Sequence, residues 1–560
     1  MTTLDIVPWP EATAAGYRAA GYWRDRTLGH WMWHWAGRFG DRVALVDGDT
    51  RLTYRQLAEH ADAFADALFD AGLRAGDRVV VQLPNRWEFV ALVLGCARAG
   101  VAPVLALPAH REHELGYLVR HATARMIVVP DVLRHHDHQA MAAAIAADAP
   151  GCVPVVLGSP VAPGHLDLAA MLRVRGDVAA RREWLDAVAP GPDDPALFLL
   201  SGGTTGQPKM ITRTHNDYEY NLRRSGEVCE FGEDTTYLVT LPAAHNFPLG
   251  CPGILGTLAV GGRVVLLASP EPGRAFATIA AERVTVTSLV PAIAQRWVVA
   301  ARAEGPDLSS LRVVQVGGSV LDPALARAVP DVLGVRLQQV FGMAEGLLNY
   351  TRLDDPEEVV LGTQGRPISP GDEVLVVDED DVPVPRGRTG ELLTRGPYTP
   401  RGYFRAAEHN ARAFTPDGWY RTGDLVRVDP GGNLVVEGRR KDLINRGGEK
   451  VSAEEVEQLA REVLGAPDAL AVPVPDARNG ERVCLVLVGR AVPTLAEVRA
   501  AYLARGVAAY KVPEQVESLD ALPLTAVGKV DRKAVRLRFA QPDRTGQTDN
   551  KEDTWMTVGN

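Results

Sequence analysis

A loop rich in glycine and hydroxyl side chains follows an apolar run, Ala196–Leu200, in the first half of the chain. It reads Ser201-Gly202-Gly203-Thr204-Thr205-Gly206-Gln207-Pro208-Lys209. Glycines let backbone N–H groups approach phosphate oxygens, while hydroxyls and a lysine add donors and positive charge. The loop differs from a P-loop because Pro208 precedes the lysine and Met210 follows it. Such a loop is also typical of a mobile turn, but the motifs that follow favour a phosphate site.

Further motifs come after this loop in a fixed order. They are Phe341–Glu345, Tyr420–Asp424, Gly438–Asp442 with Asn445–Lys450, and Pro523–Lys529. Together with the loop they resemble the adenylate-forming superfamily of acyl-CoA synthetases, peptide-synthetase adenylation domains and luciferases, and the likeness spans about residues 20–540. The subgroup that resembles the chain most is the stand-alone aryl-acid adenylating enzymes of siderophore pathways, on the segments Ala244–Leu249, Gln338–Gly346 and Asn349–Asp355.

This resemblance implies a reaction and a cofactor. A carboxylate attacks the α-phosphate of ATP and expels pyrophosphate, and the acyl group then passes to a phosphopantetheine thiol. Two anions must meet in the first step, so the site must supply cations and aligned hydrogen-bond donors. Either coenzyme A or a separate aryl carrier protein fits as the thiol acceptor.

The resemblance also assigns roles to particular residues of this sequence. Lys529 would lie over the α-phosphate and the substrate carboxylate, His245 would gate the acid pocket, and Glu345 would bind Mg²⁺. Asp424 would accept hydrogen bonds from the ribose hydroxyls, and Arg439 would contact ribose or phosphate. The implied nucleotide site comprises Ser201, Gly202, Gly203, Thr204, Thr205, Lys209, Gly317, Gly318, Val340, Phe341, Gly342, Met343, Ala344, Asp424 and Arg439.

The implied acid pocket differs from the dihydroxybenzoate pattern at two positions. Cys251 stands where that pattern has serine, and Leu348 where it has valine. A thiol is a weaker hydrogen-bond partner than a hydroxyl, and leucine fills the space of a second phenol group. Leaving that phenol unpaired costs about 1–3 kcal/mol, so we expect salicylate to be preferred over 2,3-dihydroxybenzoate. The pocket set is His245, Asn246, Phe247, Cys251, Ser319, Val340, Ala344 and Leu348, with Asn246 facing the ortho hydroxyl.

Other activities fit the same motifs. They are a 2,3-dihydroxybenzoate–AMP ligase and an aryl-CoA ligase for benzoate, anthranilate or a hydroxypicolinate. A catalytically silent aryl-acid or nucleotide-binding protein would keep the pocket, but the presence of Lys209, Glu345, Asp424 and Lys529 argues against lost catalysis.

The composition narrows the class and the compartment. The chain has 560 residues, 70 acidic and 60 basic, and its net charge of −10 argues against nucleic-acid binding by a cationic surface and against attraction to an anionic membrane. Residues 1–10 lack a signal-peptide pattern, and the longest apolar stretch, about 90–109, is broken by Arg98, Gly100 and Pro103. Five scattered cysteines argue against a disulfide framework. We expect a cytoplasmic protein.

The elements that must position the site alternate between strands and helices. The strand-like runs Val79–Leu83, Val101–Leu107, Met126–Val129 and Val153–Leu157 are interrupted by helical patterns such as Trp87–Ala99. This alternation is typical of βαβ units, which gather ligands beyond the carboxyl ends of parallel strands. We therefore expect an α/β fold, with stacked mixed or parallel sheets and helices over residues 1–440.

A second, smaller domain is expected over residues 441–540. Gly438–Asp442 is charged and is predicted to form a hinge. Beyond it, helical patterns at Ala453–Leu464 and Leu495–Arg505 alternate with strand patterns at Ala469–Val474 and Val483–Leu487, which predicts an α+β domain. The resemblance implies that this domain carries Lys529 and rotates after adenylation. Residues 541–560 are polar and are predicted to form a loose tail.

Overall fold

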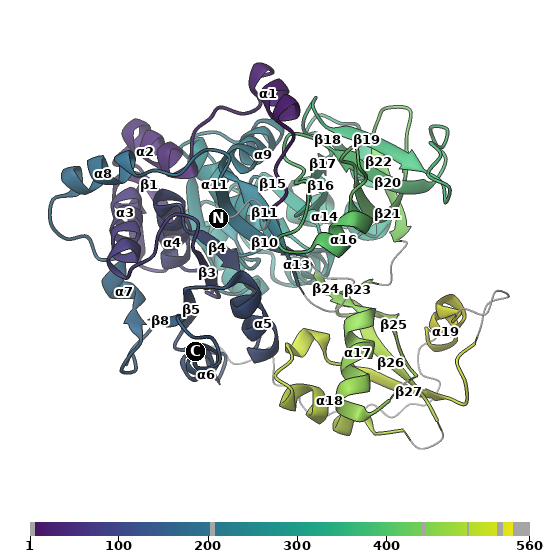
Figure 1. Cartoon of the computed structure of the whole chain (residues 1–560). Helices are drawn as coiled ribbons and strands as arrows, with labels where there is room; N and C mark the ends of the chain where they lie inside the picture. Colours follow the sequence, from purple (N-terminus) through teal and green to yellow (C-terminus); the bar gives the residue numbers. More distant parts are fainter. Residues whose placement is uncertain are drawn as a thin grey trace.

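The computed structural model describes residues 6–201, 208–439, 443–466, 468–489, 492–523 and 530–540. A large α/β domain with two extended sheets is followed by a small α+β domain, which confirms the predicted fold class (Figure 1). Within the described part of the chain, no helix combines the length and apolarity needed to cross a membrane.

The largest sheet has nine strands and is mainly parallel. Its edges are antiparallel, where β16 pairs with β17 and β1 pairs with β2. In spatial order the strands are β18 (Arg366–Pro367), β17 (Gly346–Tyr350), β16 (Arg336–Met343), β15 (Val313–Gly317), β14 (Val286–Leu289), β12 (Thr236–Val239), β13 (Arg263–Leu266), β1 (Val43–Asp47) and β2 (Thr50–Thr53).

A second sheet of seven strands is parallel except where β10 pairs with β11. Its central strands match the apolar runs of the sequence to within two residues at each end. Burial on both faces explains why they are nearly continuous Val, Ile and Leu. In order they are β11 (Lys209–Thr214), β10 (Pro195–Ser201), β4 (Ala102–Leu105), β3 (Arg78–Val81), β5 (Met126–Pro130), β8 (Val153–Leu157) and β9 (Leu166–Asp167).

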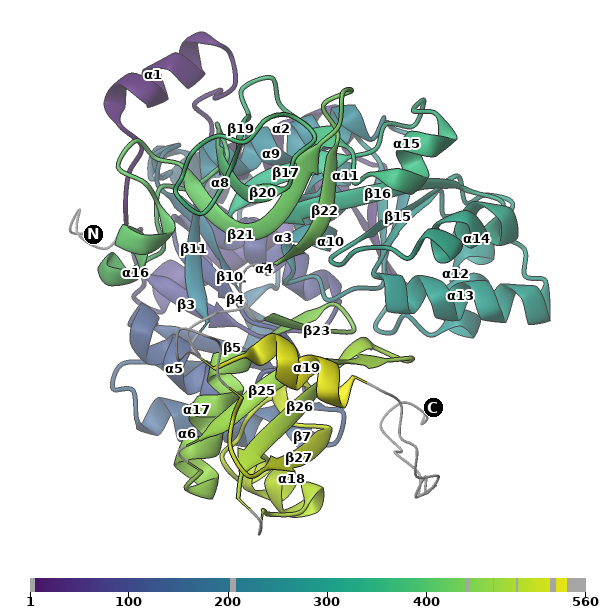
Figure 2. The same ribbon diagram turned by 90° about the vertical axis from the view of Figure 1, so that its right-hand side faces the viewer.

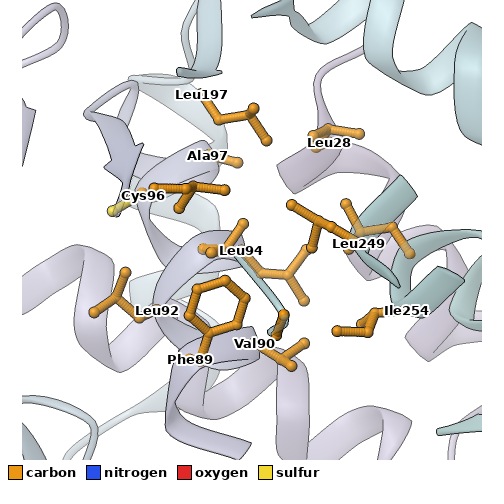
Figure 3. Close-up of a cluster of buried hydrophobic side chains, with 14 of the residues drawn as sticks. Leu28, Phe89, Val90, Leu92, Leu94, Cys96, Ala97, Leu197, Leu249 and Ile254 are labelled. Carbon is orange, nitrogen blue, oxygen red and sulfur yellow. The ribbon is translucent and has the colours of Figure 1, made fainter. Parts of the chain in front are cut away.

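Helix α4 (Trp87–Ala99) lies in the main core of the large domain. Its sequence is apolar on every side, and its residues from Glu88 to Ala99 are buried, as expected for a helix enclosed by other elements. Gly100 ends it in the left-handed conformation, with φ of 67°. Figure 3 shows its side chains among Leu28, Leu249 and Ile254, which come from neighbouring helices, and Leu197, which comes from β10.

The large domain has further helices. They are α1 (Glu11–Ala19), α2 (Leu28–Phe39), α3 (Tyr54–Asp70), α5 (Glu112–Ala122), α6 (His138–Ala147), α7 (Leu168–Met171), α8 (Val178–Ala187), α9 (His215–Val228), α10 (Asn246–Gly250), α11 (Gly253–Ala259), α12 (Pro272–Glu282), α13 (Pro291–Glu304), α14 (Pro323–Leu333), α15 (Glu357–Gly362) and α16 (Ala407–Ala413). A short hairpin joins β6 (Val132–Leu133) to β7 (His136–Asp137).

An antiparallel four-stranded sheet completes the large domain. It consists of β19 (Glu373–Val377), β20 (Gly390–Arg395), β21 (Tyr420–Val428) and β22 (Leu434–Arg439). Arg439 is the last residue of this sheet, and Leu443 is the first residue of the next. The change of sheet therefore falls at the predicted hinge, whose residues 440–442 lie outside the described part.

The small domain pairs helices with a five-stranded sheet (Figure 2). Helix α17 (Ala453–Leu464) has the predicted bounds, because Ser452 caps its first turn and Gly465 ends it in the left-handed region. The other elements are β23 (Leu443–Arg446), β24 (Glu449–Ser452), β25 (Ala469–Asp476), β26 (Gly480–Val488), α18 (Leu495–Ala504), the 3₁₀ helix η1 (Ala509–Lys511), β27 (Gln515–Leu519) and α19 (Arg532–Phe539).

The β23–β24 hairpin was missed in the sequence analysis. Asn445 pairs with Lys450 and Arg446 with Glu449, so Gly447 and Gly448 form a two-residue turn. Both glycines have positive φ, 60° and 95°, which such hairpin turns require. Each strand has four residues, and their charged side chains conceal the apolar alternation that identifies longer strands.

Candidate active site

A cavity of about 270 Å³ lies where the two large sheets, the four-stranded sheet and the small domain meet. Leu105, Ser201 and Met343, which end β4, β10 and β16, all contribute to its wall. This is the carboxyl edge of the parallel strands, where α/β folds bind their ligands. The start of β21 and the β23–β24 hairpin close the cavity from the other side.

One end of the cavity is apolar and belongs entirely to the large domain. Cys251, Val340 and Leu348 are buried in one cluster, and the ring of Phe247 packs against them. Burial raises the pKa of the Cys251 thiol to about 12, so this side chain is a neutral wall and not a nucleophile at physiological pH. Asn246 is the first residue of α10, and its side chain adds a polar group to this end.

Two glycines make the apolar end possible. A Cβ at Gly342 would lie 2.3 Å from Leu348 Cδ2, and one at Gly317 would lie 2.7 Å from the Val340 carbonyl oxygen and 3.3 Å from the Phe247 ring. Gly317 therefore acts behind the wall, by letting side chains pack on the strand. Gly342 leaves room for the Leu348 side chain, which narrows the pocket.

The other end of the cavity is polar. Ser201, the last residue of β10, pairs in register with Lys209, the first residue of β11. The predicted phosphate loop therefore begins and ends at this wall. The Lys209 ammonium lies 5.9 Å from the centre of the Tyr403 ring. Asp424 on β21 is 2% exposed and also lines the cavity. This end offers hydroxyl, ammonium and carboxylate groups to a phosphorylated, hydroxylated ligand.

Glu345 also lines the cavity and lies in the short turn between β16 and β17. Its Oε1 accepts a hydrogen bond of 2.8 Å from the Tyr403 hydroxyl, which lies 3.1 Å from the Tyr420 hydroxyl. No group of three or more His, Cys, Asp or Glu suited to a metal occurs among the described residues. Mg²⁺ is commonly held by one or two carboxylates together with substrate phosphates. The donor set therefore fits a magnesium ion that arrives with a nucleotide.

The small domain contacts the cavity through the β23–β24 hairpin. Its Glu449 Oε1 lies 3.4 Å from His245 Nε2. Asn445 Nδ2 donates to the Gly318 carbonyl at 3.1 Å, and Gly448 packs so closely on Val290 that a Cβ would lie 2.8 Å from its Cγ1. Burial opposes the charge on Glu449, but the contact with His245 and the nearby Lys511 ammonium hold its pKa below the usual value. A carboxylate thus faces His245 across the domain boundary.

A buried charge cluster lies beside this hairpin. Lys511, 3% exposed, places its Nζ 2.7 Å from Glu455 Oε1 in its own domain and 3.2 Å from Glu114 Oε1 of the large domain. The Ala508 N–H also donates to Glu114 Oε1, at 3.1 Å. Burial raises the pKa of Glu455 to about 7. We call the contacts of Glu114, Lys511, His245 and Glu449 the domain seam.

The structure brings most of the predicted residues to one cavity. On its wall are Ser201, Lys209, His245, Asn246, Phe247, Cys251, Gly318, Val340, Gly342, Met343, Ala344, Glu345, Leu348 and Asp424. Gly317, Ser319 and Phe341 lie off the wall. Gly202, Gly203, Thr204, Thr205 and Lys529, and the side chain of Arg439, lie outside the described residues.

Several wall residues carried no sequence signal. His110, Tyr510, Lys511 and Glu455 line the cavity although none belongs to a motif quoted above. A lysine or glutamate in an otherwise ordinary segment looks like a solvated side chain, and only its long-range partners distinguish it. Burial lowers the pKa of His110 to about 4, so it is neutral here.

Comparison with known proteins identifies the family. The model of the AMP-binding enzyme matches residues 32–404, and that of the AMP-binding enzyme C-terminal domain matches residues 455–529. The chain belongs to the AMP-binding enzyme family. This confirms the resemblance found in the motifs, and the chain is therefore an enzyme of the adenylate-forming type.

Relatives of this AMP-binding enzyme cover nearly its whole length. A Streptomyces salicylyl-CoA synthase / salicylate adenylyltransferase is 58% identical over 96% of this chain and 98% of its own. A 2,3-dihydroxybenzoate-AMP ligase of Bacillus subtilis is 47% identical over 95% and 97%. The apo structure of Mycobacterium smegmatis MbtA superposes with a TM-score of 0.74 at 45% identity, over 96% of this chain and all of the other.

Proposed function

We propose that this enzyme uses ATP to adenylate an aryl carboxylic acid, with salicylate as the preferred acid, and then transfers the aryl group to a phosphopantetheine thiol. The observation that carries the proposal is the two-ended cavity. An apolar end bounded by Phe247, Cys251 and Leu348 adjoins a polar end with Lys209, Glu345 and Asp424. The 58% identical salicylate adenylyltransferase supports this choice of acid.

In the first step a carboxylate oxygen forms a bond to the α-phosphorus of ATP, and the bond from that phosphorus to the bridging oxygen breaks. Pyrophosphate leaves with the electron pair, and no proton is transferred. The apolar end holds the ring so that the carboxylate projects toward His245 and the polar end. Lys209 and Lys529 are proposed to offset the charge where the two anions meet, and Asp424 to orient the ribose.

Magnesium is proposed to bind with the nucleotide, where it would neutralise phosphate charge. Glu345 is the side chain that would hold it, and the hydrogen bond from Tyr403 keeps one carboxylate oxygen in place. The other oxygen is the one available to the ion.

In the second step the thiol sulfur forms a bond to the carbonyl carbon of the aryl adenylate, and the bond to the AMP oxygen breaks. AMP and a proton are released. The hairpin that meets His245 supports the proposal that the small domain presents this face for thiol transfer and another face, with Lys529, for adenylation. Coenzyme A and an aryl carrier protein are both proposed as acceptors.

The cytoplasm is the proposed compartment. The free cysteines, Cys96, Cys152, Cys229, Cys251 and Cys484, are all buried, which suits a reducing environment.

Acid-dependent ATP–pyrophosphate exchange, measured over a panel of aryl acids, tests the proposal. We expect salicylate to exceed 2,3-dihydroxybenzoate by roughly tenfold or more in kcat/KM, because the second phenol has no partner beside Cys251 and Leu348. Thioester formation with coenzyme A and with a carrier protein then identifies the acceptor. Faster exchange with the dihydroxy acid would reverse the assignment, and binding without exchange would indicate a silent binding protein.

A further inference from the structure

We infer that Tyr218 holds the Asn246 carboxamide with its NH₂ toward the ligand. The acid pocket therefore presents a hydrogen-bond donor, and the group ortho to the substrate carboxylate must accept a hydrogen bond. The inference rests on the proposed function and specifies the substrate class of the same pocket. Tyr218 is thus a positioning residue, which acts through Asn246.

The contact that carries this inference lies behind the pocket wall. Tyr218 on α9 is fully buried, and its hydroxyl donates a hydrogen bond of 2.9 Å to Asn246 Oδ1. A carboxamide has an accepting end and a donating end. Because the oxygen is turned toward Tyr218, the nitrogen is the end left for the cavity that Asn246 lines.

The direction of this hydrogen bond follows from the surroundings of Tyr218. Among the described residues the tyrosine hydroxyl has no hydrogen-bond partner besides Asn246. If the amide were reversed, its NH₂ would donate to the tyrosine oxygen, and the hydroxyl hydrogen would be buried without an acceptor, which is unfavourable. Burial also raises the pKa of Tyr218 well above its ordinary value, so the hydroxyl keeps the proton that it donates.

Tyr218 is itself held in place on two sides. The Arg213 guanidinium lies 4.8 Å from the centre of its ring and is fixed by Asp217, with Nε 2.7 Å from Oδ1. The same guanidinium donates to the Ala344 carbonyl at 3.2 Å, which links this support to the cavity wall. On the other side, a Cβ at Gly250 would lie 2.6 Å from the tyrosine hydroxyl oxygen. The glycine leaves room for the hydroxyl.

A donor at this position sorts aryl acids by their ortho group. The hydroxyl of salicylate donates to its own carboxylate, so its oxygen remains free to accept from Asn246. The amino group of anthranilate presents N–H donors, and its lone pair is delocalised into the ring, so donor would face donor. Benzoate has no ortho group and is the neutral reference. We expect kcat/KM to decrease from salicylate to benzoate to anthranilate.

Tyr218→Phe tests the inference through a ratio of substrates. Without the hydroxyl the carboxamide can turn either end to the ligand, so the salicylate-to-anthranilate ratio of kcat/KM in pyrophosphate exchange should fall by at least roughly tenfold. The kcat/KM for benzoate should change less than about twofold, because benzoate has no ortho group that could bond the Asn246 carboxamide. Tyr220→Phe is the matched control: Tyr220 lies on the same helix and is as buried, but its hydroxyl bonds Ser369, and its variant should keep the wild-type ratio.

A second variant covers the case in which Tyr218→Phe does not fold. Gly250→Ala keeps the hydroxyl but displaces it from Asn246, and it should lower the same ratio. An unchanged ratio in a folded, active variant would refute the role of Tyr218. An equal decrease of kcat/KM for all three acids would show that Tyr218 contributes only packing. Absence of exchange with every aryl acid in the wild-type enzyme would instead refute the proposed function.

Discussion

The acid pocket and the domain seam border the same cavity but consist of different kinds of side chain. The pocket wall is apolar, comes from the large domain, and is backed by buried rings such as Tyr350 and Tyr398. The seam joins two domains through charged side chains, with Lys511 between Glu114 and Glu455 and His245 beside Glu449.

This difference corresponds to what each region has to do. Recognition of a ring needs a pocket whose shape is the same in every turnover. Close apolar packing supplies this shape, because a change of even one methylene group in a packed core costs free energy. A contact that must form and break is better made of hydrogen bonds and ion pairs, which water can replace when the domains part. We therefore expect changes in the pocket to alter which acid is used, and changes in the seam to alter which half-reaction proceeds.

The largest effect is expected from Lys529→Ala. Removing an ammonium that offsets charge in the transition state should slow adenylate formation by on the order of 10²–10³-fold. Thioester formation from supplied aryl adenylate should be largely retained, because that step is proposed to use the hairpin face of the small domain. Pyrophosphate exchange and single-turnover thioester formation measure the two halves, and equal loss of both would contradict the two-conformation view.

A change in the pocket should affect both halves alike but shift the acid preference. Cys251→Ser supplies a hydroxyl partner for a second phenol, so the salicylate-to-dihydroxybenzoate ratio of kcat/KM should fall by roughly tenfold. Cys229→Ser is the control, since Cys229 is also buried in this cluster but does not line the cavity. An unaltered ratio would mean that the Cys251 side chain does not face the ring.

A change in the seam should affect one half-reaction and leave the acid preference as it is. Glu114→Gln keeps the shape of the side chain but weakens its bonds to Lys511 and to the Ala508 N–H. Loss of one charge-assisted pairing, worth roughly 1–2 kcal/mol, should slow thioester formation several-fold and leave exchange unchanged. Glu88→Gln, a buried carboxylate that pairs with Arg86 inside the large domain, is the control. A matching loss of exchange would show that Glu114 serves the large domain alone.

The smallest effect concerns the support behind Leu348. The Leu348 N–H donates to the Tyr398 hydroxyl at 3.2 Å, and that hydroxyl donates to Asp372 Oδ2 at 2.6 Å. Burial raises the pKa of Asp372 from 3.8 to about 7. The folded protein therefore binds this proton more tightly than the unfolded chain.

The stabilisation from this carboxyl is accordingly present below about pH 4 and is lost as pH rises toward 7. Asp372→Asn should flatten the pH dependence of the unfolding free energy in this window, by at most about 1.4 kcal/mol per pH unit, with little change in exchange rate. Urea unfolding at several pH values measures it. A parallel shift of the whole curve would mean that the carboxyl does not titrate there.

Much of the fold was predictable from local pattern. Trp87–Ala99 and Ala453–Leu464 form helices with the expected bounds, because their signals are local. Gly100 ends the continuous apolar run of the first, and Ser452 and Gly465 cap the periodic pattern of the second. The β23–β24 hairpin was not predicted, although its Gly-Gly turn was visible, because four-residue charged strands show no clear alternation. The hinge prediction falls at a change of sheet, and its central residues lie outside the described part.

The family, the order of the motifs and the candidate pocket residues such as Cys251 and Leu348 could be predicted from the chain alone, because each depends on residues that are close in sequence. The folded structure was needed to show that Tyr218 bonds Asn246, that Gly317 lies behind the wall, and that Lys511 pairs with Glu114 across the seam. These contacts link positions 28, 23 and 397 residues apart, and no local pattern specifies which distant partner a buried polar group will meet. Burial then gives each pairing its strength, because a group removed from water must find its hydrogen-bond partner within the fold.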